Sequence, residues 1–119
     1  MLRKIIKLLC GLVLGNPLSF SLLRHINRNK LIILTYHNVV DKNENVGIKN
    51  ALFVSSANFE AQMRFLRKYY KPIREEDIIL ALDNKIKLPQ YSVWVTFDDG
   101  YRNNYTHAFP ILKDRKSVV

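Results

Sequence analysis

Two short apolar segments in this chain have the pattern of buried β-strands. Leu31 to Thr35 is a run of apolar and β-branched residues, too short for a buried helix and typical of a strand that is covered on both faces. Tyr91 to Phe97 predicts a second strand whose side chains alternate, with Val93, Val95 and Phe97 on one face and Trp94 and Thr96 on the other. The segment between these strands is long enough to hold helices.

Apolar residues between the two strands recur at helical spacing in two places. Ser55 or Ser56 is expected to begin the first helix, whose apolar stripe comprises Phe59, Met63, Leu66 and Tyr70. A second helix is expected from about Glu75 to Leu82, because its acidic first turn suits the positive end of the helix dipole. The stretch from Asp41 to Asn50 is rich in Asn and Asp and predicts a surface loop.

A third helix is expected after Gly100. Asn103 or Asn104 can cap it, and its apolar face comprises Tyr105, Phe109 and Leu112. Pro110 lies inside this pattern and is expected to kink the helix or to restrict it to a shorter piece. The order strand, helix, helix, strand, helix predicts an α/β protein with mainly parallel strands.

The N-terminal segment has a different pattern. Apolar residues recur at helical spacing and predict an amphipathic helix that ends at Gly15-Asn16-Pro17; they are Leu2, Ile5, Ile6, Leu9, Leu12 and Val13. Ser19 to Asn29 predicts a second short helix with Leu22, Leu23 and Ile26 on one face. The uncharged stretch from Leu8 to Leu23 is shorter and more polar than the roughly 20 apolar residues of a membrane-spanning helix.

Composition and charge divide the chain in the same place. The 119 residues, 48% of them hydrophobic, suit one ordinary globular domain. Six of the 19 Lys and Arg residues lie within residues 1–30, together with none of the 10 Asp and Glu residues, so most of the net charge of +9 belongs to this part. We therefore separate residues 1–29, a basic amphipathic segment, from residues 30–119.

A basic, apolar segment of this kind favours an anionic membrane surface as its partner. The expected location is therefore membrane-associated or in the cell envelope, and the cytoplasmic face of the membrane is included. A cleaved secretory signal and a helix packed on its own domain are the alternatives. Nucleic-acid binding is not expected, because basic and aromatic residues are not interleaved. Cys10 is the single cysteine, so the chain forms no internal disulfide and no cysteine metal cluster.

The candidate chemistry lies in Thr96-Phe97-Asp98-Asp99-Gly100. Two adjacent carboxylates follow an apolar strand, at the end where parallel α/β folds bind ligands. Gly100 permits the turn that would bring both carboxylates to one site, where one can act as a base and the other can hold a cation. The alternative interpretation is a solvated turn, since Asp-Asp-Gly is a common turn composition.

These five residues resemble the first motif of the polysaccharide deacetylases, the NodB-homology domains of carbohydrate esterase family 4. The resemblance extends in the expected order over roughly residues 31 to 113, through the strand end Leu34 to Val39, the helix Phe59 to Tyr70 and the segment Tyr101 to Lys113. The resemblance implies a distorted (β/α) barrel, of which residues 30–119 would form an incomplete first part. It also implies an activity: removal of N-acetyl groups from an amino-sugar polysaccharide with the help of a divalent metal, zinc by preference.

The resemblance also implies roles for individual residues. Asp98 matches the general base of the motif and Asp99 matches a metal ligand. His37, Tyr36 and Tyr101 are further candidates for lining the site, although His37 can equally bond to backbone at the end of its strand. Tyr101 stands where many members of the family have proline, and this variant resembles the branch that acts on poly-N-acetylglucosamine-type polymers.

The chain departs from the family because it has no His-Ser/Thr-x-x-His motif, which supplies two further metal ligands. Its histidines are His25, His37 and His107, none of them in that spacing. We therefore expect an N-terminal portion that is inactive alone. The alternatives are a non-catalytic remnant that binds a membrane or a carbohydrate, and an aspartate-based phosphatase, whose usual Asp-x-Asp spacing Asp98 and Asp99 lack.

Overall fold

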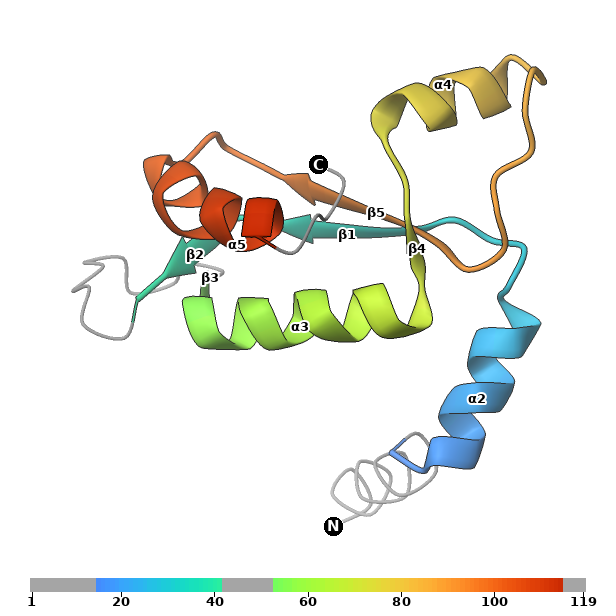
Figure 1. Ribbon diagram of the computed structural model, residues 1–119, viewed down its shortest axis with the longest axis horizontal. Helices are drawn as coiled ribbons and strands as arrows, with labels where there is room; N and C mark the ends of the chain where they lie inside the picture. Colours follow the sequence, from blue (N-terminus) through green and yellow to red (C-terminus); the bar gives the residue numbers. More distant parts are fainter. Residues whose placement is uncertain (1–14, 42–52, 115–119) are drawn as a thin grey trace, which may run out of the picture.

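The computed structural model describes residues 15–41 and 53–114 (Figure 1). The helix expected over Leu2 to Val13 and most of the loop expected from Asp41 to Asn50 lie outside the described residues. In chain order the elements are α2 (Pro17–Ile26), β1 (Ile32–Tyr36), β2 (Asn38–Val40), β3 (Phe53–Ser55), α3 (Ser56–Tyr69), β4 (Lys71–Pro72), α4 (Glu75–Leu82), β5 (Ser92–Phe97), the π-helical turn η1 (Asn104–Ala108) and α5 (Phe109–Asp114).

The strands form two parallel sheets. In the larger sheet β5 is central, with β1 on one side and β4 on the other. The register of β1 on β5 runs from Ile32 opposite Val93 to Tyr36 opposite Phe97. In the smaller sheet β2 pairs with β3. The predicted mixed α/β fold with parallel strands is confirmed, whereas β2, β3 and β4 were not predicted because strands of two or three residues carry no readable alternation.

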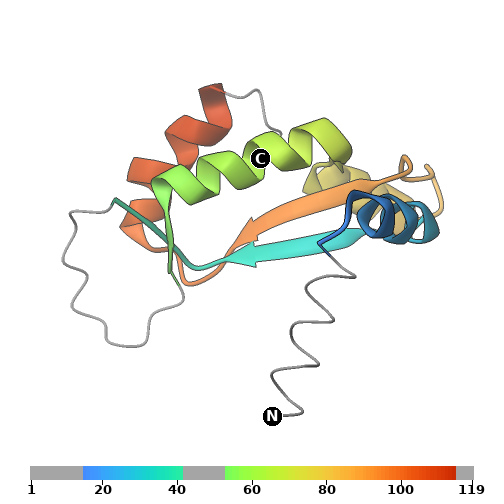
Figure 2. The same ribbon diagram turned by 90° about the horizontal axis from the view of Figure 1, so that it is seen from below.

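The hydrophobic core lies between the larger sheet and the helices α3 and α5, which lie on the same side of it (Figure 2). Phe59 of α3 and Val93 of β5 are completely buried at its centre. The Phe59 ring meets the Tyr36 ring edge to face, with centroids 4.9 Å apart, and the Phe97 ring at 6.0 Å. Aromatic packing therefore joins α3 to the ends of β1 and β5.

Cover on both faces of β1 was expected, but among the described residues only one face is covered. Burial alternates along the strand, and Ile33 is 54% exposed while its neighbours Ile32 and Leu34 pack against the core. The other face of β1 and β5 carries Thr35 and Thr96, whose hydroxyl oxygens are 3.0 Å apart. An apolar run identifies a strand, but it does not tell whether a second layer covers it.

The two helices predicted between the strands are confirmed. Ser55 caps α3, because its hydroxyl accepts a hydrogen bond from the Asn58 N–H at 3.2 Å. The second helix, α4, has the predicted bounds, and Asp77 in its first turn accepts a hydrogen bond from the Arg74 N–H at 3.1 Å. This contact satisfies a backbone donor at the helix start.

The third helix differs from its prediction in its start and in its apolar face. Asn103 and Asn104 lie inside the helical segment and do not cap it. The Phe109 N–H bonds to the Asn104 carbonyl five residues back, and this extra residue in the turn rotates the following side chains. Leu112 is buried as predicted, but Ala108 is buried with it, whereas Tyr105 is 73% exposed and stacks on Phe109. The helix continues through Pro110, immediately after the widened turn.

The short helix predicted from Ser19 to Asn29 is present as α2. The Asn16 side chain caps it by accepting a hydrogen bond from the Leu18 N–H at 2.9 Å. None of the helices in the described part of the chain is long and apolar enough to cross a membrane.

We expect Phe59→Ala to lower the free energy of unfolding by about 3–5 kcal/mol, because it removes a fully buried ring and leaves a cavity. Phe53→Ala is the matched control: this ring is 61% exposed, and its loss should change stability by about 0.5 kcal/mol or less. Urea unfolding followed by circular dichroism measures both variants. Equal losses would show that the core is not built around Phe59.

Candidate functional site

The candidate site begins where the β1–β5 pairing ends. The Asp98 N–H donates a hydrogen bond to the Tyr36 carbonyl at 2.9 Å, which extends the pairing by one residue beyond the paired strands. Because the two strands are parallel, the residues that follow β1 and those that follow β5 emerge at the same edge of the sheet. His37 and Asp98, far apart in the sequence, therefore lie side by side.

A contact between side chains at this edge joins a histidine to a carboxylate. His37 Nε2 lies 3.7 Å from Asp98 Oδ2, and the two side chains are 30% and 57% exposed. This distance exceeds that of a hydrogen bond, and the partial exposure of both groups makes the attraction weak. Solvent and a soluble ligand can reach the carboxylate.

A sharp turn follows Asp98. Asp99 has φ of 65° and Gly100 has φ of 58°, so two consecutive residues adopt the left-handed conformation. Glycine adopts it without strain, and Asp tolerates it better than most residues do. The turn expected on the basis of Gly100 is thus present, and it places Asp98 and Asp99 next to each other on an exposed edge.

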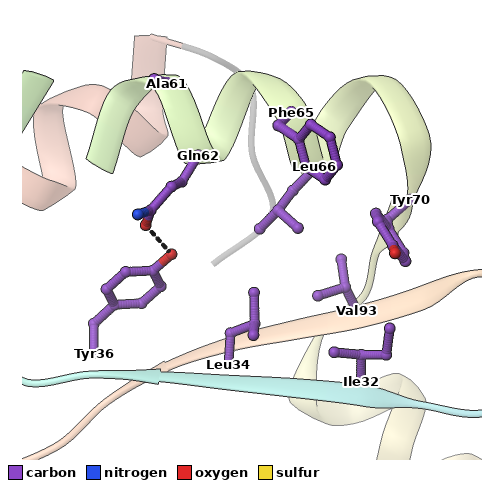
Figure 3. Close-up of a pocket in the computed structure, with 9 residues that line it drawn as sticks. All are labelled: Ile32, Leu34, Tyr36, Ala61, Gln62, Phe65, Leu66, Tyr70 and Val93. Atoms are coloured by element: carbon purple, nitrogen blue, oxygen red, sulfur yellow. Dashed lines mark hydrogen bonds between the residues drawn. The ribbon is translucent and has the colours of Figure 1, made fainter. Parts of the chain in front are cut away.

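Tyr36 and Tyr101 flank this edge in different ways. The Tyr36 hydroxyl donates to Gln62 Oε1 of α3 at 2.7 Å, so the phenol lies on the helix side of β1 (Figure 3). Burial raises the pKa of the Tyr36 phenol. Tyr101 directly follows the turn, is 38% exposed, and accepts a hydrogen bond from the Asn104 N–H at 3.0 Å through its carbonyl.

An apolar groove of about 620 Å³ lies between β1 and α3 (Figure 3). Neither Asp98 nor Asp99 lines this groove, which is formed by Ile32, Leu34, Tyr36, Ala61, Gln62, Phe65, Leu66, Tyr70 and Val93. A smaller depression of about 230 Å³ adjoins His37 and is lined by Thr35, Tyr36, His37, Asn38, Phe53 and Val54. The carboxylates and the larger groove are therefore separate features of the molecule.

Two asparagines, expected from the sequence only as helix caps, contact His37 and Asn38. The Asn104 side-chain amide donates to the His37 carbonyl at 2.8 Å, and the Asn103 amide donates to Asn38 Oδ1 at 2.9 Å. The side-chain oxygens of both are buried without a hydrogen-bond partner among the described residues. The sequence signal that could have found them is a pair of adjacent amides shortly after the Asp-Asp-Gly turn.

The described residues do not form a complete metal site. No group of three or more His, Cys, Asp or Glu side chains converges anywhere in the described ranges. Catalytic zinc generally takes three protein ligands. His107 is paired elsewhere, with its Nδ1 3.7 Å from Asp41 Oδ2. Asp99 alone cannot hold a zinc ion, so we derive no reaction step through a metal.

Sequence comparison finds relatives over most of the described residues. A Bacillus subtilis protein, YxkH, assigned to the polysaccharide deacetylases, is 36% identical over 85 residues, which are 71% of this chain and 28% of the relative. A poly-β-1,6-N-acetyl-D-glucosamine N-deacetylase of Staphylococcus aureus is 33% identical over 98 residues, 74% of this chain and 33% of the relative. The chain thus spans about a third of the length of these relatives. No protein-family model matches it.

A comparison of structures agrees. IcaB from Ammonifex degensii superposes with a TM-score of 0.62 at 34% sequence identity, over 73% of this chain and 35% of that protein. Similarity in sequence and in structure therefore covers the same share of the chain.

The left-handed turn generates a prediction about stability. We expect Asp99→Gly to raise the free energy of unfolding by about 0.5 kcal/mol, because glycine relieves the strain of a positive φ. Asp83→Gly is the matched control, since Asp83 has φ of −76° and the same change should lower stability by about 0.5–1 kcal/mol. The two variants are compared by their midpoints of urea unfolding. A decrease in stability for Asp99→Gly as large as that for Asp83→Gly would contradict the turn geometry.

Tyr36 generates a prediction about pH. Its pKa is raised above the ordinary value of 10.0, so the stabilisation that depends on the neutral phenol is complete below pH 10 and is lost as the pH rises through the folded-state pKa. In Tyr36→Phe, the free energy of unfolding should therefore fall less steeply as the pH rises above 10. Tyr105→Phe, at a 73% exposed ring, should leave the decline unchanged. If the free energy of unfolding depends on pH in the same way in Tyr36→Phe and in the unsubstituted chain, the assigned role of the buried phenol is refuted.

Proposed function

The chain belongs to the polysaccharide deacetylase family, and we propose that it forms part of a hydrolase that removes N-acetyl groups from an amino-sugar polysaccharide. The relatives named as deacetylases support the reaction class, and the Staphylococcus aureus relative supports a poly-N-acetylglucosamine substrate. Because the chain spans about a third of these relatives, the complete activity is proposed for a larger domain to which residues 30–119 contribute.

The observation that carries this proposal is the pair of carboxylates on the turn after β5, beside His37, which directly follows β1. The Asp98 side chain is exposed enough to meet a water molecule and a polymer, and its backbone is held by the hydrogen bond from its own N–H to the Tyr36 carbonyl. Asp99 is held on the left-handed turn directly after it. A fixed base with an adjacent second carboxylate suits hydrolysis of an amide.

In the proposed reaction, Asp98 accepts a proton from the water that attacks the acetamide carbonyl carbon. A C–O bond forms, the C–N bond of the resulting tetrahedral species breaks, and the nitrogen leaves as an amine by taking up the proton that Asp98 accepted from the water. The products are acetate and a free amino sugar. We propose that His37, whose Nε2 lies 3.7 Å from the Asp98 carboxylate, lines the site beside this base.

We propose Asp99 as one ligand of a divalent cation, zinc in the first instance. Such an ion, when bound, would polarise the acetamide carbonyl and make water more acidic. We propose that the further metal ligands come from parts of the domain outside the described residues, because the described residues bring no three ligating groups together. The chain alone is accordingly proposed to be inactive.

The proposal also includes an incomplete (β/α) barrel. In such a barrel the helices cover one face of each strand and the other face points to the interior. The larger sheet has this asymmetry, with α3 over Leu34 and Val93 and with Ile33 exposed on the other face. β1 is an edge strand among the described residues, and we propose that a further strand of the same domain pairs with it, with the apolar groove between β1 and α3 receiving side chains of the added elements.

A non-catalytic carbohydrate-binding remnant is the second candidate function. It is favoured by the absence of a three-ligand group from the described residues. The two candidates differ in what happens when the rest of a deacetylase domain is supplied.

The test is a hybrid protein in which residues 31–114 replace the matched portion of the Staphylococcus aureus relative. We expect the hybrid to release acetate from poly-β-1,6-N-acetylglucosamine oligomers and to lose this activity with a chelator. Asp98→Asn should lower kcat by about a hundredfold or more, because it removes the base. Asp83→Asn, the same change at an exposed carboxylate paired with Lys85, should leave kcat nearly unchanged.

Two results would contradict the proposal. A hybrid that unfolds cooperatively but releases no acetate would favour the non-catalytic remnant, whose glycan binding can then be measured on the chain itself. An active hybrid that is indifferent to chelators, or to Asp98→Asn, would overturn the assigned mechanism.

A further inference from the structure

The helix α2 has two faces with opposite surroundings. On one face the Phe20 ring packs against the Phe65 and Tyr69 rings of α3, at centroid distances of 5.3 and 5.4 Å. On the other face Leu18, Leu22 and Ile26 are 79%, 61% and 60% exposed. These three residues recur at every fourth position and form one stripe, which we call the α2 stripe. We propose that the α2 stripe binds the surface of an anionic lipid membrane.

Arg24 fixes which face of α2 points outward. Its guanidinium lies over the Tyr91 ring, 4.2 Å from the centroid, and its Nη1 donates a hydrogen bond to the Tyr69 carbonyl at 2.7 Å. Together with the packing of Phe20, this contact holds the side of the helix that carries Phe20 and Arg24 against the domain. The helix cannot turn the α2 stripe inward without breaking these contacts, so three large apolar side chains remain available to an external partner.

The charge of the surrounding chain selects the partner. Besides Arg24, residues 1–30 carry five basic side chains and no acidic one, and two of the five, Arg28 and Lys30, follow α2 in the sequence. A basic region beside an apolar helix face is complementary to anionic headgroups above an acyl layer, and each basic residue near such a surface strengthens binding. A second copy of this chain is a poor partner, because each copy carries a net charge of +9.

The placement of α2 gives this interaction a consequence for the candidate site. Figure 1 and Figure 2 show α2 beside the end of the sheet at which β1 and β5 begin, whereas Asp98 follows the opposite end of β5. A membrane bound through α2 would therefore leave the carboxylate turn directed away from the lipid, accessible to a polymer. The membrane interaction does not depend on the proposed deacetylase function, and each can fail without the other.

The first experiment measures sedimentation of the 119-residue chain with vesicles of phosphatidylcholine mixed with phosphatidylglycerol, and with vesicles of phosphatidylcholine alone. We expect binding to the anionic vesicles that weakens with added salt. The variant Leu18→Gln/Leu22→Gln should lower the partition coefficient by about tenfold or more, because it removes two apolar side chains from the contact. Leu80→Gln/Leu82→Gln on α4 is the matched control and should bind as the unsubstituted chain does.

Binding that is unaffected by Leu18→Gln/Leu22→Gln, or that is equally strong on neutral vesicles, would overturn the proposal. Sedimentation equilibrium without vesicles tests the second-copy alternative, and a dimer abolished by the same double substitution would also overturn it. Cooperative unfolding of each variant shows that a loss of binding is not a loss of fold.

The second experiment locates the contact. In a Trp94→Phe background, Leu22→Trp fluorescence should be quenched by brominated phosphatidylcholine in anionic vesicles, whereas Leu82→Trp should not be quenched. Equal quenching at both positions would contradict an oriented contact through the α2 stripe.

Discussion

The parallel pairing of β1 with β5 is the interaction on which the rest of the molecule depends. It places Val93 against Ile32 in the core and Phe97 beside Tyr36, where Phe59 packs on both rings. The pairing continues beyond the strands with one more hydrogen bond, from the Asp98 N–H to the Tyr36 carbonyl, and this bond brings the Asp98 carboxylate next to His37. The same register thus determines the packing of α3 and the composition of the candidate site. A shift by one residue would turn the core side chains to the opposite face of the strand.

The edge formed in this way contains unfavourable local features, as functional sites often do. Asp99 adopts a left-handed conformation, and the side-chain oxygens of Asn103 and Asn104 are buried without a hydrogen-bond partner in the described part of the chain. An unpaired buried oxygen costs free energy, and a residue chosen for stability alone would avoid it. The amide groups of the same two asparagines hold Asn38 and the His37 carbonyl, so the helix after the turn stabilises the end of β1.

Local sequence patterns predicted the elements that are long enough to show a period. Phe59, Met63 and Leu66 predicted α3, and the acidic first turn predicted α4. The π-helical turn was not predictable from spacing, because one extra residue exchanges the buried and exposed positions around Ala108 and Phe109. Asp98 and Asp99 were singled out by their position after an apolar strand. The support of His37 by Asn104 depends on a contact between distant residues, which no local pattern contains.

The most direct measurement is the scalar coupling across the hydrogen bond between the Asp98 amide nitrogen and the Tyr36 carbonyl carbon, observed by NMR on the chain in solution. The structure predicts that this coupling is present, that the Asp98 amide exchanges with solvent as slowly as the amides within β5, and that the His37 ring shows Overhauser contacts to the Asp98 methylene. An Asp98 amide without coupling that exchanges as fast as the amide of Gly100 would contradict the pairing that brings His37 to the carboxylates.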